Sequence, residues 1–348
     1  MKTKVLIIDD SALMRQLLTE ILSRDPTLEV VGAASDPFVA REKILRLAPD
    51  VVTLDVEMPR MDGLTFLEKL MRAHPLPVVM VSSLTERSCE TTWRALELGA
   101  TDFVTKPKLD VQSGTMQLAQ EIIDKVKAAA HAKVRGVRRR PDLTLDSHPL
   151  PSATLSFRAT HKVVAIGAST GGTEAIREVL AKLPADAPGI VMVQHMPEKF
   201  TTSFAGRLNS LSKVSVSEAR DGDRILPGHA LLAPGNFHME VARSGAEYRV
   251  RVFAADPVNG HRPSVDVLFA SCARQMGSNA VGVILTGMGA DGAREMAAMR
   301  RAGAHTIAQD EESCVVFGMP KEAIAMGGAA EVLPLHRITT GILRAAAA

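Results

Sequence analysis

The stretch Val163-Val-Ala-Ile-Gly-Ala-Ser-Thr-Gly-Gly-Thr173 predicts a buried strand that turns sharply into a helix. The apolar run 163–166 is typical of a buried strand. The run 167–171 fits the pattern G-x-S-x-G, in which a tight strand-to-helix turn exposes a serine hydroxyl. A helix over 173–182 would leave backbone N–H groups free to hold an oxyanion near Ser169. Ser169 is therefore a candidate nucleophile, and a capping serine or a phosphate-binding loop are the alternatives.

Length and composition limit the class of protein. The 348 residues, 46% of them hydrophobic, predict about two globular domains, and the net charge of +2 gives no overall signal for nucleic acid. Cys89, Cys272 and Cys314 are far apart, which argues against a disulfide scaffold or thiolate zinc site and suits a reducing compartment. With neither a bilayer-spanning apolar run nor a signal peptide in view, we expect a cytoplasmic protein without membrane insertion.

The first 125 residues alternate strand and helix patterns, which predicts a parallel, doubly wound α/β sheet. Polar side chains stand where the predicted strands end: Asp9 and Asp10, Asp55, Ser82, and Lys106. Such ends border one crevice, and carboxylates gathered there suit Mg²⁺. Lys106 and Ser82 could hold a phosphoryl group, and Asp55 could accept it as an aspartyl phosphate.

This order of residues resembles a response-regulator receiver domain, which has a flavodoxin-like fold with a five-stranded parallel sheet. The resemblance implies Asp55 as the phosphorylation site, Phe103 as the switch aromatic, and the backbone carbonyl of Glu57 as a metal ligand beside Asp9, Asp10 and Asp55. It also implies a histidine kinase as the phosphodonor. Serine at position 82, where threonine is also found, leaves the role of the hydroxyl intact.

Residues 126–160 predict a basic, proline-containing linker between two domains. The run His131-Ala-Lys-Val-Arg-Gly-Val-Arg-Arg-Arg-Pro141 could bind an acidic partner or nucleic acid, but a solvated linker is the interpretation we prefer.

Residues 161–348 predict a second α/β domain with a doubly wound, mostly parallel sheet and a small antiparallel hairpin region. Ser169, His195 and Asp291 each follow an apolar strand, so they can meet in one crevice at the edge of the sheet. An imidazole can activate a serine hydroxyl, and a carboxylate can fix the tautomer of that imidazole. A single histidine after a strand is more often a loop or core residue. The hypothesis of a catalytic triad therefore depends on Ser169, His195 and Asp291 occurring together.

A rival pattern lies in the same region. Gly287-Met-Gly-Ala-Asp-Gly292 also fits G-x-G-x-x-G between a strand and a helix, and Asp310 follows at the spacing of a ribose-binding acid. Asp291 would place a carboxylate inside a loop that should cradle a pyrophosphate, and few strands remain after it to complete a nucleotide-binding half. A cofactor site therefore ranks below the serine site.

The stretches Gln194-His-Met-Pro197, Phe200-Thr-Thr-Ser-Phe-Ala205, Ala233-Pro-Gly-Asn-Phe-His238, Thr286-Gly-Met-Gly-Ala-Asp-Gly292 and Ala308-Gln-Asp-Glu311 resemble the catalytic domain of chemotaxis protein-glutamate methylesterases. The resemblance implies Ser169 as nucleophile, His195 as general base and Asp291 as the group that orients it. It places Thr170 and Met288 at the pocket, with the Met288 N–H as an oxyanion donor. His229, His238, His261 and His305 are interpreted as structural.

Two functions remain open. The first is a phosphorylation-activated serine esterase that hydrolyses glutamate methyl esters, and deamidates selected glutamines, on methyl-accepting chemotaxis receptors, with no cofactor for the esterase itself. The second is a non-catalytic signalling module whose second domain binds a nucleotide when the receiver is phosphorylated. A DNA-binding output is the least favoured, because no basic helix-turn-helix pattern comes after the linker.

Overall fold

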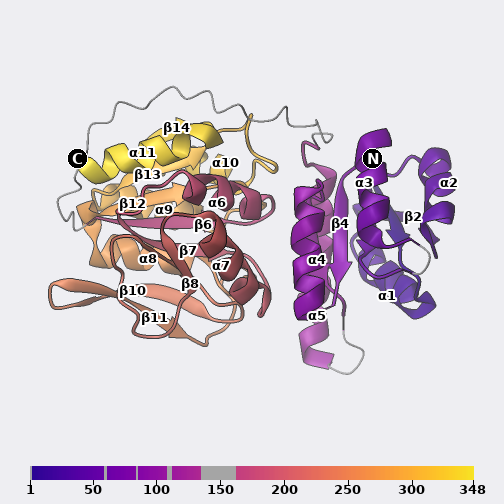
Figure 1. Ribbon diagram of the computed structural model, residues 1–348, viewed down its shortest axis with the longest axis horizontal. Coiled ribbons are helices and arrows are strands. Elements are labelled where there is room, and N and C mark those ends of the chain that lie inside the picture. Colours follow the sequence, from indigo (N-terminus) through magenta and orange to yellow (C-terminus); the bar gives the residue numbers. More distant parts are fainter. Residues whose placement is uncertain (1, 59–60, 84, 108–111, 135–161) are drawn as a thin grey trace.

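The computed structural model describes residues 2–58, 61–83, 85–107, 112–134 and 162–348 (Figure 1). Most of the predicted linker, residues 126–160, lies outside the described residues. None of the described helices combines the length and the apolar character that crossing a bilayer requires.

The N-terminal part is an α/β layer structure. In its described residues five parallel strands form one sheet in the order β2-β1-β3-β4-β5. The strands are β1 (Thr3–Ile8), β2 (Leu28–Ala34), β3 (Val51–Asp55), β4 (Val78–Ser82) and β5 (Asp102–Thr105), and the helices are α1 (Ala12–Ser23), α2 (Pro37–Leu47), α3 (Gly63–Ala73), α4 (Glu86–Glu97) and α5 (Gln112–Ala130). This is the fold that the sequence predicts for the receiver.

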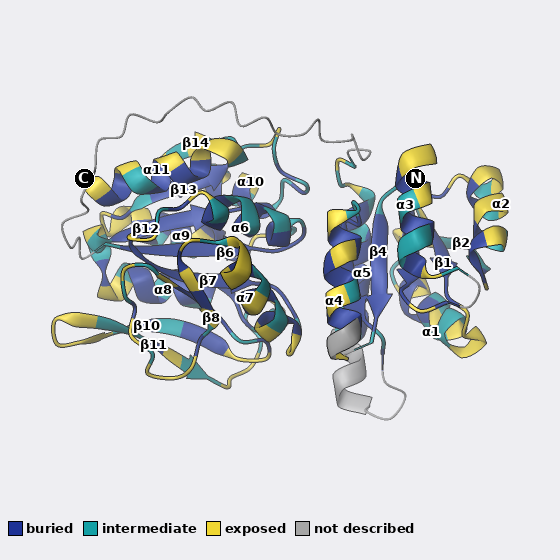
Figure 2. Ribbon diagram, in the orientation of Figure 1, coloured by how far each residue is buried: buried dark blue, intermediate teal, exposed yellow. Residues whose placement is uncertain are grey.

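Local sequence explains where these elements start. Val5, Leu6 and Ile7 are fully buried, because helices cover both faces of a parallel sheet (Figure 2). Ser11 caps α1 by accepting from Met14 N at 3.3 Å, and Asp62 caps α3 by accepting from Thr65 N at 2.8 Å. These caps begin the helices just past the strand ends, which leaves the carboxyl edge of the sheet open for polar side chains.

The C-terminal part contains a second and larger sheet. Its described strands lie in the order β14-β13-β12-β6-β7-β9-β8, all parallel, and β10 pairs with β11 in a separate antiparallel hairpin. The strands are β6 (Val163–Ala168), β7 (Gly189–Gln194), β8 (Ser215–Glu218), β9 (His229–Leu232), β10 (His238–Ser244), β11 (Glu247–Phe253), β12 (Ala280–Ile284), β13 (His305–Gln309) and β14 (Glu331–Leu333). The helices are α6 (Gly172–Ala181), α7 (Phe200–Leu211), α8 (Val265–Gln275), the short 3-10 helix η1 (Gly277–Asn279), α9 (Ala293–Arg301), α10 (Met319–Ala325) and α11 (Leu335–Ala347).

Strand β6 is the central strand of this sheet. The chain runs from β6 outward to β7 on one side, and β12 returns to pair with β6 on the other. The strand order therefore reverses at β6, and such a switch point opens a crevice at the carboxyl ends of the strands.

The fold differs from the sequence prediction in two details. The helix expected over 173–182 spans Gly172–Ala181, and the sequence did not predict α7. The sequence predicted a β-rich middle region that includes the segments 214–216 and 230–233. In the structure these segments fall at β8 and β9, which extend the main parallel sheet at one edge.

Helix α4 packs against α7 of the second part, and Phe103 of β5 meets the same helix. The rings of Trp93 and Phe204 stack with centroids 5.1 Å apart, and Phe103 meets Phe200 at 4.4 Å. Trp93 also donates its indole N–H to Ser203 Oγ at 2.9 Å. One hydrophobic cluster runs through this contact and joins the cores of both parts.

Candidate active site

Three adjacent strands bring the candidate serine, histidine and aspartate to one edge of the sheet. Ser169 follows β6, His195 follows β7, and Asp291 lies in the loop after β12. Ala168 pairs with Gln194 across β6 and β7, and the backbone N–H of His195 donates to the carbonyl of Ala168 at 3.1 Å. Ser169 directly follows Ala168, and His195 directly follows Gln194. The serine and the histidine therefore leave the sheet side by side.

Ser169 lies in a tight turn between β6 and α6. The Gly172 N–H donates to the Ser169 carbonyl at 2.7 Å, and Gly171 has a φ of 78°, a conformation that favours glycine. On the other side, a Cβ at Gly287 would lie 2.8 Å from the Ser169 Cβ. Only glycine fits there, so the loop after β12 approaches the serine closely.

His195 and Asp291 form a buried pair. The Nε2 atom of His195 lies 2.8 Å from Asp291 Oδ2, and the two side chains are 5% and 1% exposed. Among the described residues the buried Nδ1 atom has no hydrogen-bond partner. Because the carboxylate occupies Nε2, Nδ1 is the nitrogen left to accept a proton from a hydroxyl.

The carboxylate of Asp291 sits on the N-terminus of helix α8. It accepts hydrogen bonds from Val265 N at 2.6 Å and Asp266 N at 3.2 Å, and from the hydroxyl of Ser264 at 2.7 Å. Burial alone would raise the pKa of Asp291, but the hydrogen bonds from His195, Asn259 and Ser264 outweigh it and hold that pKa well below its usual range. Asp291 therefore stays charged and can stabilise an imidazolium on His195.

Helices α8 and α9 cap each other. Asp291, just before α9, accepts from the N-terminus of α8, and Asp266 in α8 accepts from Gly292 N at 3.0 Å at the start of α9. Asn259 donates from Nδ2 to Asp291 at 2.8 Å and to Asp266 at 2.7 Å. This reciprocal arrangement fixes the position of the Asp291 carboxylate.

Thr170 follows Ser169 in the chain, and Met288 lies on the opposite side of the crevice, in the loop after β12. In the described part of the chain neither of their backbone N–H groups donates a hydrogen bond. Thr170 is buried, and Met288 follows the glycine that touches Ser169. Two unpaired N–H groups beside a hydroxyl are the donor set that an oxyanion requires.

The predicted phosphorylation residues gather at the carboxyl edge of the first sheet. One oxygen from each of Asp9, Asp10 and Asp55 can lie within 4.8 Å of the others. Lys106 Nζ donates to Asp55 at 2.8 Å and lies 3.7 Å from Asp9 Oδ2. Lys106 thus bridges two of the three carboxylates.

The charges at this edge are not balanced by Lys106 alone. Burial, and then the charge of Asp55, raise the pKa of Asp9 to about 6, and burial raises the pKa of Asp55 against the opposing effect of Lys106. Asp9 Oδ2 is buried and accepts no hydrogen bond from a described residue. Three oxygen donors with one such orphaned atom fit a hard divalent cation such as Mg²⁺.

The other residues predicted for the receiver site are Ser82, Glu57 and Phe103, and they do not all lie at the acidic cluster. Ser82 is fully buried at the end of β4 and accepts from Thr92 Oγ1 at 3.0 Å, while the Glu57 N–H donates to Asp55 at 3.2 Å. Phe103 is 2% exposed and faces the second part of the protein, where it meets Phe200. The expected switch aromatic is therefore part of the contact between the two parts.

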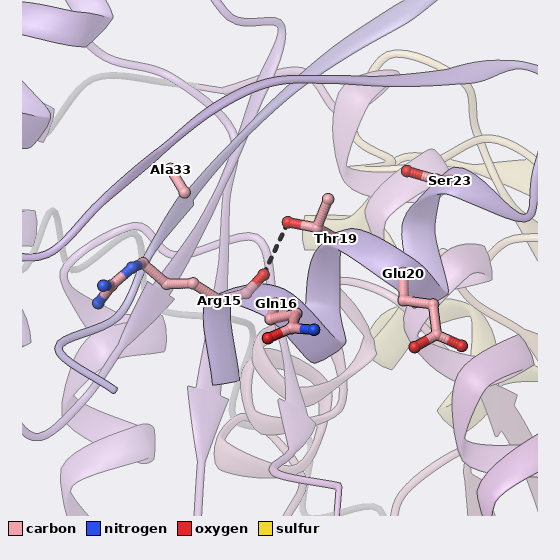
Figure 3. A pocket seen from close by; sticks show the side chains of 6 residues that line it. All are labelled: Arg15, Gln16, Thr19, Glu20, Ser23 and Ala33. Carbon is pink, nitrogen blue, oxygen red and sulfur yellow. Dashed lines mark hydrogen bonds between the residues drawn. The ribbon is translucent and has the colours of Figure 1, made fainter. Parts of the chain in front are cut away.

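A shallow surface hollow of about 460 Å³ lies elsewhere, along α1 (Figure 3). Its lining combines Arg15, Gln16, Thr19, Glu20, Ser23 and Ala33. The Thr19 hydroxyl donates to the Arg15 carbonyl at 2.7 Å, and the Arg15 guanidinium donates to the carbonyls of Asp9 and Asp10. These bonds tie the hollow to its own helix and to the nearby backbone, and none of its lining residues belongs to the serine site.

Sequence reasoning missed two residues of the serine site. The ring of His261 stacks on the ring of His195 with centroids 3.7 Å apart and an interplanar angle of 14°. Asn259 donates to the Asp291 carboxylate. His261 was interpreted as structural, and the structure adds that the turn around it brings its ring against that of His195. Cys272 and Cys314 are buried, and burial raises the pKa of each thiol to about 12.

Together these features define a class of protein: a receiver-type sheet coupled to an α/β domain that presents a serine, a histidine and an aspartate at its switch point. The family model of the response regulator receiver domain matches residues 5–113, and that of the CheB methylesterase matches residues 164–342. The chain belongs to the CheB methylesterase family.

Relatives that match nearly the whole length of the chain support this family assignment. The chain is 61% identical to a protein-glutamate methylesterase/protein-glutamine glutaminase of Geobacter metallireducens, over 95% of this chain and 93% of that protein. It is 58% identical to one of Pseudomonas aeruginosa, over 100% and 98% of the two chains. The crystal structure of the Thermotoga maritima CheB methylesterase catalytic domain is 41% identical, with a TM-score of 0.52, over 53% of this chain and 97% of that one.

Proposed function

We propose that the protein is a phosphorylation-activated serine esterase that hydrolyses glutamate methyl esters on methyl-accepting chemotaxis receptors and deamidates selected glutamines there. The observation that carries the proposal is the buried His195–Asp291 pair at the strand end next to that of Ser169, with Nδ1 of the imidazole left without a partner among the described residues. The names of the relatives that match nearly the whole chain support the choice of substrate.

The residues divide the reaction between them. Nδ1 of His195 takes the proton as Ser169 Oγ attacks the ester carbonyl, and Asp291 stabilises the imidazolium through Nε2. The backbone N–H groups of Thr170 and Met288 hold the oxyanion. His195 then protonates the departing methoxide, which leaves as methanol, and water, deprotonated by the same nitrogen, releases the glutamate from Ser169. For a glutamine the leaving group is ammonia.

The first sheet supplies the control of this activity. The Thr170 hydroxyl, one residue after Ser169, donates to Asp102 Oδ2 at 2.6 Å, and Asp102 directly precedes Phe103 in β5. We infer that this contact represents the restrained form and that an aspartyl phosphate at Asp55 shifts the population toward a form with an accessible serine. Residues 1–125 act as the switch, 126–160 as the link and 161–348 as the catalytic domain, with α5 continuing to Ala130.

Mg²⁺ supports the phosphoryl transfer in this proposal. Asp9, Asp10 and Asp55 would hold the ion together with the carbonyl of Glu57, while Ser82 and Lys106 would contact the phosphoryl oxygens. The bound cation would offset the negative charge that gathers around Asp55. A chemotaxis histidine kinase would donate the phosphoryl group, and the cytoplasm, where receptor helices are methylated, would be the site of action.

The described residues do not favour the nucleotide-binding alternative. Asp291 in the glycine-rich loop is occupied by His195 and α8, and Asp310 accepts from the backbone and hydroxyl of the nearby Ser313. Both acids are therefore used within the fold.

A serine-directed fluorophosphonate tests the proposal. We expect one phosphonyl group on Ser169, located by peptide mass spectrometry, with faster labelling after addition of a small phosphodonor. The variant Ser169→Ala should not be labelled at the corresponding peptide. Label on another residue, with Ser169 unmodified, would contradict the assignment.

A further inference from the structure

Resting on the proposed esterase, we propose that His261 is a positioning residue that holds the ring plane of the general base His195 through face-to-face stacking. The imidazole of His195 is tied at one atom only among the described residues, by the bond from Nε2 to Asp291 at 2.8 Å. A single bond at the ring edge leaves the ring free to tilt about that bond. A second ring lying flat on its face removes that freedom.

The stacking geometry is close and nearly parallel. The two centroids lie 3.7 Å apart with the planes at 14°, so the His261 ring covers the face of the His195 ring. Tilting His195 by a large angle would drive it into His261. Nδ1 is thereby kept at the orientation in which it can meet the serine hydroxyl, and the advantage expected of such fixed geometry is large.

His261 is itself held by a fixed turn. Its backbone pairs with Val258 through two hydrogen bonds of 3.0 Å, and the Arg262 guanidinium donates to the Ala255 carbonyl at 2.6 Å and to the side chain of Asn236. Asn259, within the same turn, bonds to Asp291. One turn thus restrains both the catalytic base and its carboxylate.

The charge of His261 suits a position against a base that becomes a cation. Burial, and then the neighbouring charge of His195, lower the pKa of His261 to about 3, so it is neutral near pH 7. A neutral aromatic face attracts a cation that forms above it. The stacked ring therefore also favours the imidazolium that appears in each proton transfer.

The experiment compares His261→Ala with His261→Phe in the full chain, assayed by methanol release from methylated receptor membranes with a small phosphodonor. His261→Ala removes the ring, and we expect kcat to fall by about 10- to 100-fold while KM stays within about twofold. His261→Phe restores a flat ring that cannot titrate, and kcat should return to within about threefold of the wild type. The exposed His229, whose ring forms a hydrogen bond with the Pro227 carbonyl, provides the control His229→Ala, which should leave kcat unchanged.

Two further measurements separate the possible failures. The rate of fluorophosphonate labelling at Ser169 should fall with kcat in His261→Ala, and thermal unfolding reports whether each variant is folded. Wild-type kcat in a folded His261→Ala, or an equal loss in a folded His261→Phe, would overturn the positioning role. Failure of the underlying esterase would appear differently, as an absence of methanol release from the wild type or as full release by Ser169→Ala.

Discussion

At the scale of single residues, the site depends on which nitrogen of one imidazole is occupied. Asp291 takes Nε2 of His195 and is itself held by further donors, from Asn259, Ser264, Val265 and Asp266. Asp291→Asn removes the charge that we propose stabilises the imidazolium, and it also turns amide hydrogens toward the backbone N–H donors of α8. We expect kcat to fall by about 10³- to 10⁴-fold, measured as methanol release. Asp256→Asn, at an exposed position in the same region, is the control, and near-normal turnover in Asp291→Asn would rule out the assigned role.

The acidic residues of the first sheet make a second prediction about pH. A carboxyl group whose pKa is raised on folding stabilises the fold below its unfolded value and loses that contribution as pH rises toward the folded value. For Asp9 this window runs from about 4 to about 6. Mg²⁺ offsets the repulsion only when the carboxylates are charged, so it should raise the thermal midpoint at about pH 7.5 and have little effect at about pH 5. Asp9→Asn should remove most of the shift, and a shift that is as large under the acidic condition would contradict the site.

At the scale of elements, the proposed restraint of the enzyme depends on the contact between α4 and α7. Ser203 on α7 accepts the indole N–H of Trp93, so Ser203→Ala leaves a partly buried donor unpaired in the restrained form, at a cost of about 1–3 kcal/mol. Esterase activity without a phosphodonor should rise several-fold, while activity with the donor should change little. Ser210→Ala, at an exposed position of the same helix, should behave like the wild type. Unchanged basal activity in Ser203→Ala would show that this contact does not restrain the enzyme.

The elements also show how far sequence patterns reach. Ser169, His195 and Asp291 could be predicted together because each comes after an apolar strand, and parallel strands end at the same edge of their sheet. His261 follows β11, which belongs to the separate hairpin and not to the main sheet, and its position depends on the turn at Val258, so periodicity carried no signal for it. Helix α7 escaped prediction because its first turn, Phe200-Thr-Thr-Ser, combines a β-branched pair with residues that favour other local structure, and burial of Phe200 and Phe204 stabilises the helix instead.

At the scale of the whole molecule, an aromatic contact joins the two parts that carry the proposed phosphorylation site and the serine site. Asp55 lies at the end of β3, while Phe103 and Asp102 on β5 contact Phe200 and Thr170 of the second part. The docking could not be predicted from sequence, because a few side chains such as Trp93 decide it and no repeated pattern marks them. Asp55→Asn should leave basal esterase activity within about twofold of the wild type and abolish the increase caused by a phosphodonor. A full increase in that variant would place the phosphoryl group elsewhere.

The most direct test of the central claim is methanol release from methylated receptor membranes by the wild type and by Ser169→Ala, each with and without a small phosphodonor. We predict that the wild type releases methanol, that the phosphodonor increases its rate, and that Ser169→Ala releases none above background in either condition. Release by Ser169→Ala at the rate of the wild type would contradict a serine nucleophile at this position.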